Sequence, residues 1–82
     1  WQGFVDGVVT PRFPDGLSVW PASGQWKSAA GPIVREGSYV LSLVHPEGAA
    51  AETAIADIVR AYKARYRQEA VMRVRAPACI SF

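Results

Sequence analysis

The sequence predicts a small α+β domain: a ferredoxin-like sandwich that lacks its first strand, with an antiparallel sheet and two helices on one face. Three observations predict it. The chain has 82 residues, enough for one domain. Half of the residues are apolar and a fifth are charged, as in globular proteins. The spacing of apolar residues changes along the chain in the order helix, strand, strand, helix, strand.

Residues 1–9 are predicted to form the end of a helix. Their apolar side chains recur at helical spacing, and Pro11 and Pro14 then end the helix. The chain opens without a methionine, so we expect a processed or N-terminally truncated form of a single domain, 1–82. The helical spacing is kept by Trp1, Phe4, Val5, Val8 and Val9.

Two predicted strands follow and are joined as a hairpin. The first covers 17–20 and 25–27, and Pro21 and Gly24 predict a bulge and an edge position. The second strand covers 33–44. Both of its faces are mostly apolar, which is typical of a strand in the middle of a sheet.

Residues 49–67 form the clearest predicted helix, and a last strand is predicted at 71–74, continuing at 79–82 beyond Pro77. One additional strand at the N-terminal end of this order would give βαββαβ, in which the first strand is central. Without it, backbone groups on both sides of the gap lack partners. We therefore expect a missing segment, a strand from another chain, or direct pairing of the last strand with 33–44 to fill the gap.

Several short motifs resemble one bacterial family. They are Thr10-Pro11-Arg12-Phe13-Pro14-Asp15-Gly16-Leu17, Gly24-Gln25-Trp26, Arg35-Glu36, Tyr62-Lys63-Ala64-Arg65-Tyr66 and Gln68-Glu69-Ala70-Val71. The family is a bacterial domain of unknown function, number three-five-seven-four, and the resemblance covers nearly the whole chain. Its members often carry an export signal and then a short strand before the point where this chain begins. The resemblance implies this fold and an exported or periplasmic location, and it brings no known activity.

The charge map gives one alternative function. Residues 1–59 carry a net charge of −3, from three basic and six acidic side chains, and residues 60–82 carry +5, from six basic and one acidic. Such a surface indicates an anionic partner, but a solvated helix end that complements the helix dipole gives the same pattern, and we favour that interpretation. The whole-chain charge of +2 argues against nucleic acid. The anionic-partner candidates are Arg60, Lys63, Arg67, Arg73 and Arg75.

No catalytic motif is present, so no catalytic residue is assigned. A second alternative is a cofactor-free, ferredoxin-like enzyme with a pocket between sheet and helices. Its acid–base candidates would be His45, Arg12 and Glu36, and at least two of them would have to converge in one cavity. The hairpin aromatics either line a ligand pocket or simply cover the sheet, and we favour the second. The possible ligand-binding residues are Trp20, Trp26, Tyr39 and Gln68.

We expect a binding or structural module rather than an enzyme. It would act through its sheet face or edge, as a homo-oligomer or with a strand from another chain, because nine aromatics and an open sheet favour contact surfaces. Cys79 is the only cysteine and His45 the only histidine, so we predict no disulfide, no metal site and no cofactor. The apolar runs are shorter than the roughly 20 residues that span a membrane.

Overall fold

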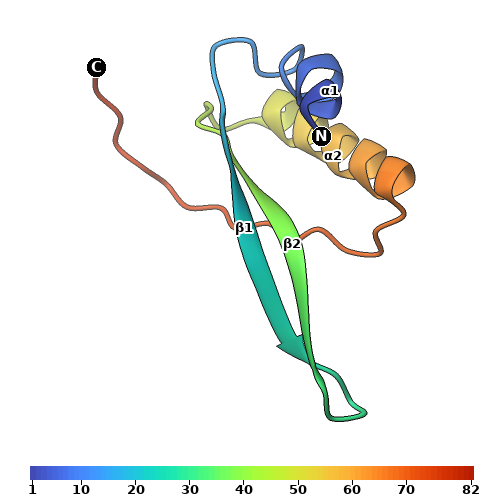
Figure 1. The fold of residues 1–82 in the computed structure, drawn as a ribbon. Helices are drawn as coiled ribbons and strands as arrows, with labels where there is room; N and C mark the ends of the chain where they lie inside the picture. The colour runs from blue at the N-terminus through green and yellow to red at the C-terminus, as the bar shows by residue number, and fades with distance from the viewer.

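The computed structural model describes all 82 residues and has the element order helix, strand, strand, helix (Figure 1). A short α-helix, α1 (Gln2–Phe4), continues into a π-helix, η1 (Val5–Val9). The strands β1 (Ser18–Lys27) and β2 (Ile33–Ser42) form a hairpin, and the helix α2 (Ala49–Tyr66) follows. The predicted α+β class and the order of these elements are confirmed.

The first helical segment is held in place by its apolar side. Phe4, Val5 and Val9 are buried, as their spacing predicts. The backbone is wider at its end, where the amide of Thr10 donates to the carbonyl of Val5 at 2.9 Å, one residue further back than in an α-helix. Pro11 has no N–H with which to continue the hydrogen bonding, so the predicted stop is confirmed.

The hairpin is regular along its whole length. β1 and β2 pair without interruption over ten residues each, so the predicted bulge is wrong. Pro21 lies opposite Tyr39 in this ladder, and proline is tolerated where its missing N–H would face away from the neighbouring strand. β2 ends at Ser42, two residues earlier than predicted. It has one neighbour only, so it is an edge strand and not the predicted central one.

Both ends of the helix α2 carry residues that favour a helix terminus. It begins after Gly48, whose φ of 145° favours glycine, and it ends at Arg67, which adopts the left-handed conformation with φ of 52°. Glu52 lies in the first turn, and Lys63 and Arg65 lie in the last. This placement of charge complements the helix dipole, as predicted.

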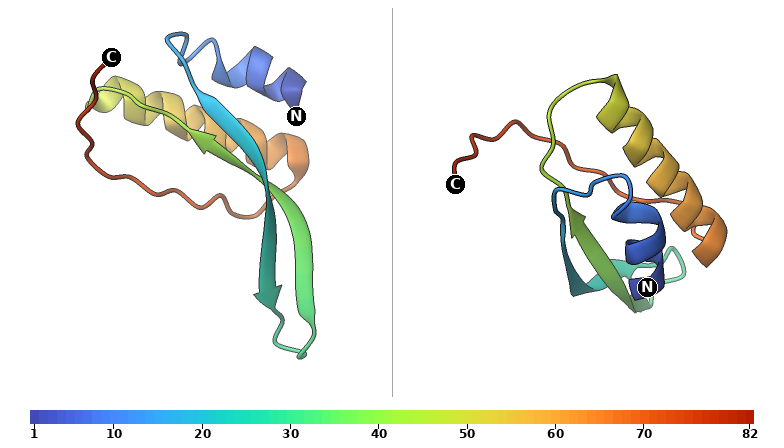
Figure 2. Two further views of the ribbon diagram at one scale, coloured as in Figure 1. Left: turned by 60° about the vertical axis from the view of Figure 1, so that its left-hand side comes forward. Right: turned by 90° about the horizontal axis from the view of Figure 1, so that it is seen from above.

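The core lies where both helical segments meet one end of the hairpin. Phe4, Val9 and Ile58 form a buried cluster. Figure 2 shows the helices beside one half of the hairpin, while the other half projects away from them. Partly buried residues from the hairpin, the loops and α2 pack around the cluster: Trp1, Val8, Phe13, Leu17, Leu41, Leu43, Ala61, Tyr62 and Tyr66.

The hairpin therefore has two halves with different surroundings. The near half, which meets the helices, pairs Ser18–Ala22 with Ser38–Ser42. The far half, which projects beyond them, pairs Ser23–Lys27 with Ile33–Gly37 (Figure 1). Of the two, the near half supplies the strand residue that packs on the buried cluster, Leu41.

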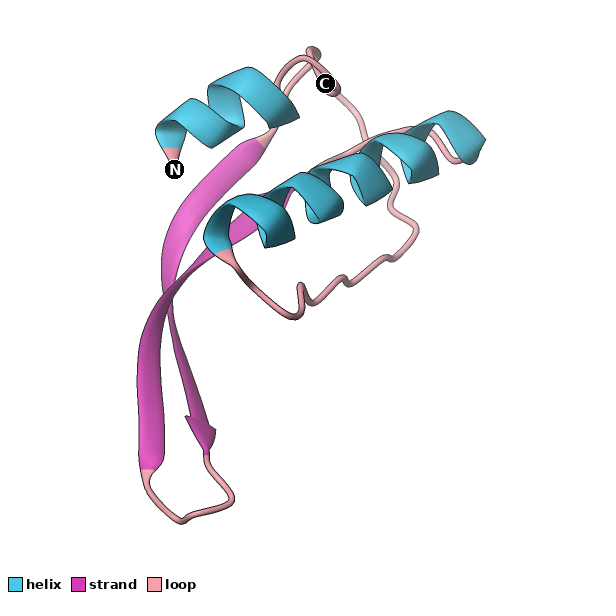
Figure 3. Cartoon of the chain, turned by 90° about the vertical axis from the view of Figure 1, so that its right-hand side faces the viewer, coloured by secondary structure: helices cyan, strands magenta, loops and turns pink.

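The C-terminal segment Gln68–Phe82, which we name the tail, has no regular secondary structure. The strands predicted at 71–74 and 79–82 are not formed, so this part of the prediction is wrong. Extended backbone makes a strand only where a neighbour supplies hydrogen-bond partners, and the tail forms no ladder with β2. It runs back along α2 instead (Figure 3). Direct pairing of the tail with β2 therefore does not close the predicted gap.

Candidate functional site

One side of β2 has no neighbouring strand, and we name it the free edge. The amide of Ser28 donates to the carbonyl of Pro32 at 3.0 Å, in the same register as the hairpin ladder. Hydrogen-bonded pairs alternate with non-hydrogen-bonded pairs in an antiparallel ladder, so the even-numbered residues of β2 bond to β1. The odd-numbered residues direct their N–H and C=O groups to the free edge: Ile33, Arg35, Gly37, Tyr39 and Leu41.

The two faces of the hairpin differ in how much of them is covered by other parts of the chain. On the helix side, Tyr39 stacks on Trp1, with ring centroids 4.4 Å apart and planes inclined by 10°. Trp20 and Trp26 lie on the opposite face, and about half of each side chain is exposed. We name that side the open face, and it is lined by Trp20, Trp26, Val34 and Val40.

The predicted ligand-binding residues do not gather at one place. Tyr39 lies on the helix side of the hairpin, and both tryptophans lie on the open face. Gln68 lies at the start of the tail, where its side-chain amide donates to the carbonyl of Tyr66 at 3.3 Å. It therefore caps the end of α2, one of the two roles that its position after a helix allows.

Of the three predicted acid–base residues, Glu36 lies apart, whereas the ring of His45 lies 5.9 Å from that of Phe13, the neighbour of Arg12. The Nδ1 atom of His45 donates to the carbonyl of Pro46 at 2.8 Å, and Arg12 donates to the carbonyl of Val8 at 2.8 Å. Both side chains are thus engaged with nearby backbone. Glu36 lies in the far half, six residues before the end of β2, which is about 20 Å along a strand. The structure does not bring Glu36 to His45.

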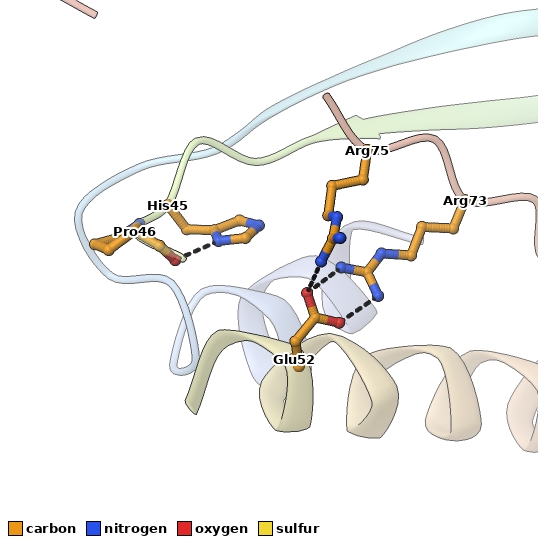
Figure 4. Close-up of polar contacts among 5 residues, drawn as sticks. All are labelled: His45, Pro46, Glu52, Arg73 and Arg75. Atoms are coloured by element: carbon orange, nitrogen blue, oxygen red, sulfur yellow. Dashed lines mark hydrogen bonds and ion pairs between the residues drawn. The ribbon is translucent and has the colours of Figure 1, made fainter. Parts of the chain in front are cut away.

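Glu52 binds two arginines of the tail (Figure 4). Nη1 of Arg73 donates to Oε2 at 2.7 Å and Nη2 donates to Oε1 at 2.9 Å, while Nη1 of Arg75 donates to Oε1 at 3.0 Å. The hydrogen bond from Arg73, helped by that from Arg75, lowers the pKa of Glu52 to about 2. We name these three residues the carboxylate clamp. It fastens the tail to the first turn of α2.

The carboxylate clamp is not among the sequence predictions, which assign Arg73 and Arg75 to the anionic-partner group. The clamp has a sequence signal: two arginines at alternate positions face one way on an extended segment, and Glu52 lies early in the preceding helix. Arg60 is engaged as well, since it donates to Asp57 at 2.8 Å. Three of the five candidate cations therefore pair within the chain. Binding of an anionic partner by the group stays a prediction.

A shallow groove of about 390 Å³ lies between α2 and the tail. Its apolar part comes from Ile55, Ala56 and Val59 of α2 and from Val71 of the tail. Arg60, Lys63 and Arg73 supply cations around it. The groove thus combines an apolar floor with a positively charged rim.

The sequence matches the family described as "Protein of unknown function (DUF3574)" over residues 1–82. The chain belongs to this family. The resemblance carried by the short motifs is therefore confirmed, and the description of the DUF3574 family assigns no activity. No curated protein and no solved structure matches the chain.

Two further findings concern metal ligands and membrane spans in this DUF3574 chain. No three side chains of the His, Cys, Asp and Glu types lie together as metal ligands. No helix has the length and apolar character of a membrane span. The features that offer contacts to a partner are the free edge, the open face, the carboxylate clamp and the groove beside it.

Proposed function

We propose that this chain is an interaction module that accepts an extended strand of a partner along the free edge of β2. The one-sided pairing of β2 carries the proposal. β1 occupies one side over ten residues, while five residues direct backbone groups to the other side. A strand laid antiparallel along the free edge would satisfy these groups, as in other cases of strand addition.

The exposed surface of the chain supports the need for a partner. The chain exposes 6626 Å², whereas a folded monomer of 8.9 kDa is expected to expose about 4800 Å². The excess of about 1800 Å² is larger than the roughly 800 Å² that one partner contributes to a standard interface. Only four of the 82 residues are buried, so much of the apolar surface of the chain is exposed.

The composition of the free edge also supports the proposal. Proteins protect exposed strand edges with charges, prolines, bulges or covering elements. Arg35 is the single charged residue among the five that direct backbone groups outward, and the strand has neither a proline nor a bulge. Ile33 is half exposed. This edge therefore has little protection against strand addition.

The test compares two proline variants at cross-strand partners. Gly37 directs its N–H to the free edge, and Ser23, opposite to it, directs its N–H to the outer edge of β1. Gly37→Pro removes a donor from the free edge without removing a bond of the hairpin, and a side chain at Gly37 meets no atom within 4 Å. Ser23→Pro makes the same change on the other edge. Circular dichroism checks that both variants fold.

The probe is a ten-residue peptide that alternates valine with threonine. Binding should slow hydrogen exchange at the amides of Arg35, Gly37 and Tyr39 in the unsubstituted chain. Gly37→Pro should weaken binding about tenfold, while Ser23→Pro should leave it unchanged. Equal binding by both variants, or protection confined to the outer edge of β1, would contradict the proposal.

We also propose that the domain acts in an exported or periplasmic location of a bacterium. The support is the resemblance to family members that carry export signals. The test is to express a full-length relative with a C-terminal reporter enzyme that is active only outside the cytoplasm. Reporter activity is expected, and a fully inactive but intact fusion would contradict this part.

A further inference from the structure

We infer that the open face binds the open face of a second copy of this chain, so that two copies pack face to face about a two-fold axis. This contact goes beyond the proposed function and does not depend on it. It uses the broad side of the hairpin and leaves the backbone groups of the free edge available.

In the far half of the hairpin, the open face is apolar while the helix side is polar, although this half projects away from the helices (Figure 2). Trp26 and Val34 are cross-strand partners on the open face, and 53% of Trp26 is exposed. The helix side of the same half carries the polar residues Ser23, Gln25, Lys27 and Arg35, together with Ile33 and Gly37. Apolar side chains that gather on one exposed face, rather than scatter over both, mark a surface that contacts a partner.

The pattern of residues on the open face is the same when it is taken from either end. From β1 the face receives Trp20, Ala22, Gly24 and Trp26, and the residues of β2 opposite them are Val40, Ser38, Glu36 and Val34. Each end therefore has a tryptophan beside a valine, and the middle has small or polar residues. A two-fold dimer needs such a self-complementary surface. A two-fold axis across the strands lays a reversed copy of the face on the original, pair for pair.

In this arrangement, residues of the same kind face each other. Trp20 of one copy lies over Trp26 of the other, so two aromatic rings meet at each end of the contact. Glu36 is the single charged residue on the face, and it lies over Ser38, whose hydroxyl can donate a hydrogen bond to the carboxylate. The face carries no cation, so it does not suit an anionic partner such as nucleic acid. A second copy suits it, because no carboxylate lies directly opposite another.

The outer edge of β1 is protected against another strand. Pro21 is one of the odd-numbered residues of β1, which lie in the non-hydrogen-bonded pairs of the ladder and direct their backbone groups outward. Its missing N–H interrupts the row of donors along this edge. The face of the hairpin is therefore better suited to a second copy than the outer edge of β1.

The size of the open face predicts a weak dimer. Ten residues at about 3.3 Å each and two strands at about 4.8 Å each give a face of about 330 Å² in projection. Two half-exposed tryptophans stand above the strands and add to the area that is removed from water. Specific interfaces need about 1000 Å² from both partners together, and two open faces come close to this limit. We expect reversible association with a dissociation constant in the micromolar range.

The test is sedimentation equilibrium of the chain from micromolar to near-millimolar concentration, with two matched variants. Ala22→Glu adds a carboxylate to the middle of the open face and should weaken the dimer at least about tenfold, because like charges then face each other. Ser23→Glu makes the same change at the next residue, on the helix side of the far half, and should leave the dimer within about twofold. Circular dichroism checks folding. Ser38→Glu, on the strand opposite Ala22, repeats the change if Ala22→Glu does not fold.

The indole N–H signals of the tryptophans give a second readout by nuclear magnetic resonance. Those of Trp20 and Trp26 should shift with protein concentration over the range in which the dimer forms. The signal of Trp1 should stay in place, because its ring stacks on Tyr39 on the helix side. A soluble paramagnetic agent should broaden the signals of Trp20 and Trp26 more in the dilute sample than in the concentrated one.

The outcomes distinguish the open face from the free edge. Association that is lost in Ala22→Glu and kept in Gly37→Pro supports the face-to-face dimer. If the chain stays monomeric at the highest concentration, or if Ala22→Glu dimerises as strongly as Ser23→Glu, the face-to-face dimer is overturned and the proposed function stands. If Gly37→Pro abolishes the dimer and Ala22→Glu keeps it, the copies join at the free edge, and the face-to-face dimer is overturned as well.

Discussion

The near and far halves of the hairpin belong to one continuous ladder of backbone pairs, but they differ in what packs against them. The near half supplies Leu41 to the cluster formed by Phe4, Val9 and Ile58. The far half carries Trp26 and exposes 53% of it, although its pairing is as regular as that of the near half. Isolated two-stranded hairpins are at best marginally stable. Packing against the helices therefore stabilises the near half, and the far half extends beyond that support.

The comparison shows which part of the chain is stabilised by packing and which part is exposed to contacts with a partner. The packed end contains every fully buried residue, while the far half and the tail contain none. A paired strand that extends beyond the packed core leaves the backbone groups of its free edge exposed, and such an edge can pair with another strand. Four predictions test this division between a packed end and an open end.

The largest effect is expected at Phe4, which is 1% exposed. Phe4→Ala should cost about 3–5 kcal/mol of the free energy of unfolding, because it removes a ring from the centre of the packed end. Urea unfolding followed by circular dichroism measures the loss. The matched control is Phe82→Ala at the fully exposed end of the tail, which should change stability by less than about 0.5 kcal/mol. Similar losses in both variants would break the comparison.

A smaller effect is expected where the packed end meets the hairpin. The stack of Trp1 on Tyr39 joins the first helical segment to the middle of β2. Tyr39→Ala should cost about 1–2 kcal/mol, since it loses the aromatic pair and part of the buried area. Exchange at the far-half amide of Trp26, which is hydrogen-bonded within the hairpin ladder, should quicken by more than the global loss of stability predicts. If exchange there follows only global unfolding, the stack does not anchor the hairpin.

The parts of the fold that follow from local spacing could be predicted from the sequence. The burial of Phe4, Val5 and Val9 depends on helical period alone, and so does the stripe of α2 that includes Ile58. The predicted strand at 71–74 has the composition of a strand, but a strand also needs a neighbour, and composition cannot supply one.

The candidate site was harder to predict because it depends on tertiary relations. Glu52 and Arg73 are 21 residues apart, and their pairing requires the tail to reverse at Arg67. The predicted open sheet already implies that one strand has an edge without a neighbour. Which residues face it depends on the register of the hairpin, which the predicted bulge would have shifted by one residue.

A gain of stability is expected at Tyr66 in the packed end. Its ring contacts Phe4 and Tyr62, and its hydroxyl is buried without a hydrogen-bond partner. Tyr66→Phe removes the unpaired hydroxyl and keeps the ring, so it should raise the free energy of unfolding by about 1 kcal/mol. Thermal unfolding measures the gain. Tyr62→Phe serves as a comparison on the same helix, and a loss of stability in Tyr66→Phe would show that the hydroxyl has a partner in solution.

The smallest effect on stability is expected at Glu52. A change at this residue should instead have its clearest effect on the order of the tail. Its pKa is lowered from 4.5 to about 2, so the carboxylate clamp contributes fully above the ordinary value and is lost as the pH falls through the lowered one. The amides of Arg73 and Arg75 should therefore become mobile between pH 4.5 and 2 in nuclear magnetic resonance spectra, while those of Phe4 and Ile58 stay ordered as long as the chain remains folded.

Glu52→Gln should produce the same mobile tail at neutral pH, because the neutral amide cannot hold two guanidinium groups as a carboxylate does. Glu47→Gln, before the start of α2, is the matched control and should leave the tail in place. The unfolding transition should barely move in either variant, since the tail adds no buried residue to the packed end. If Glu52→Gln unfolds the chain, the tail belongs to the core, and the division into a packed end and an open end is wrong.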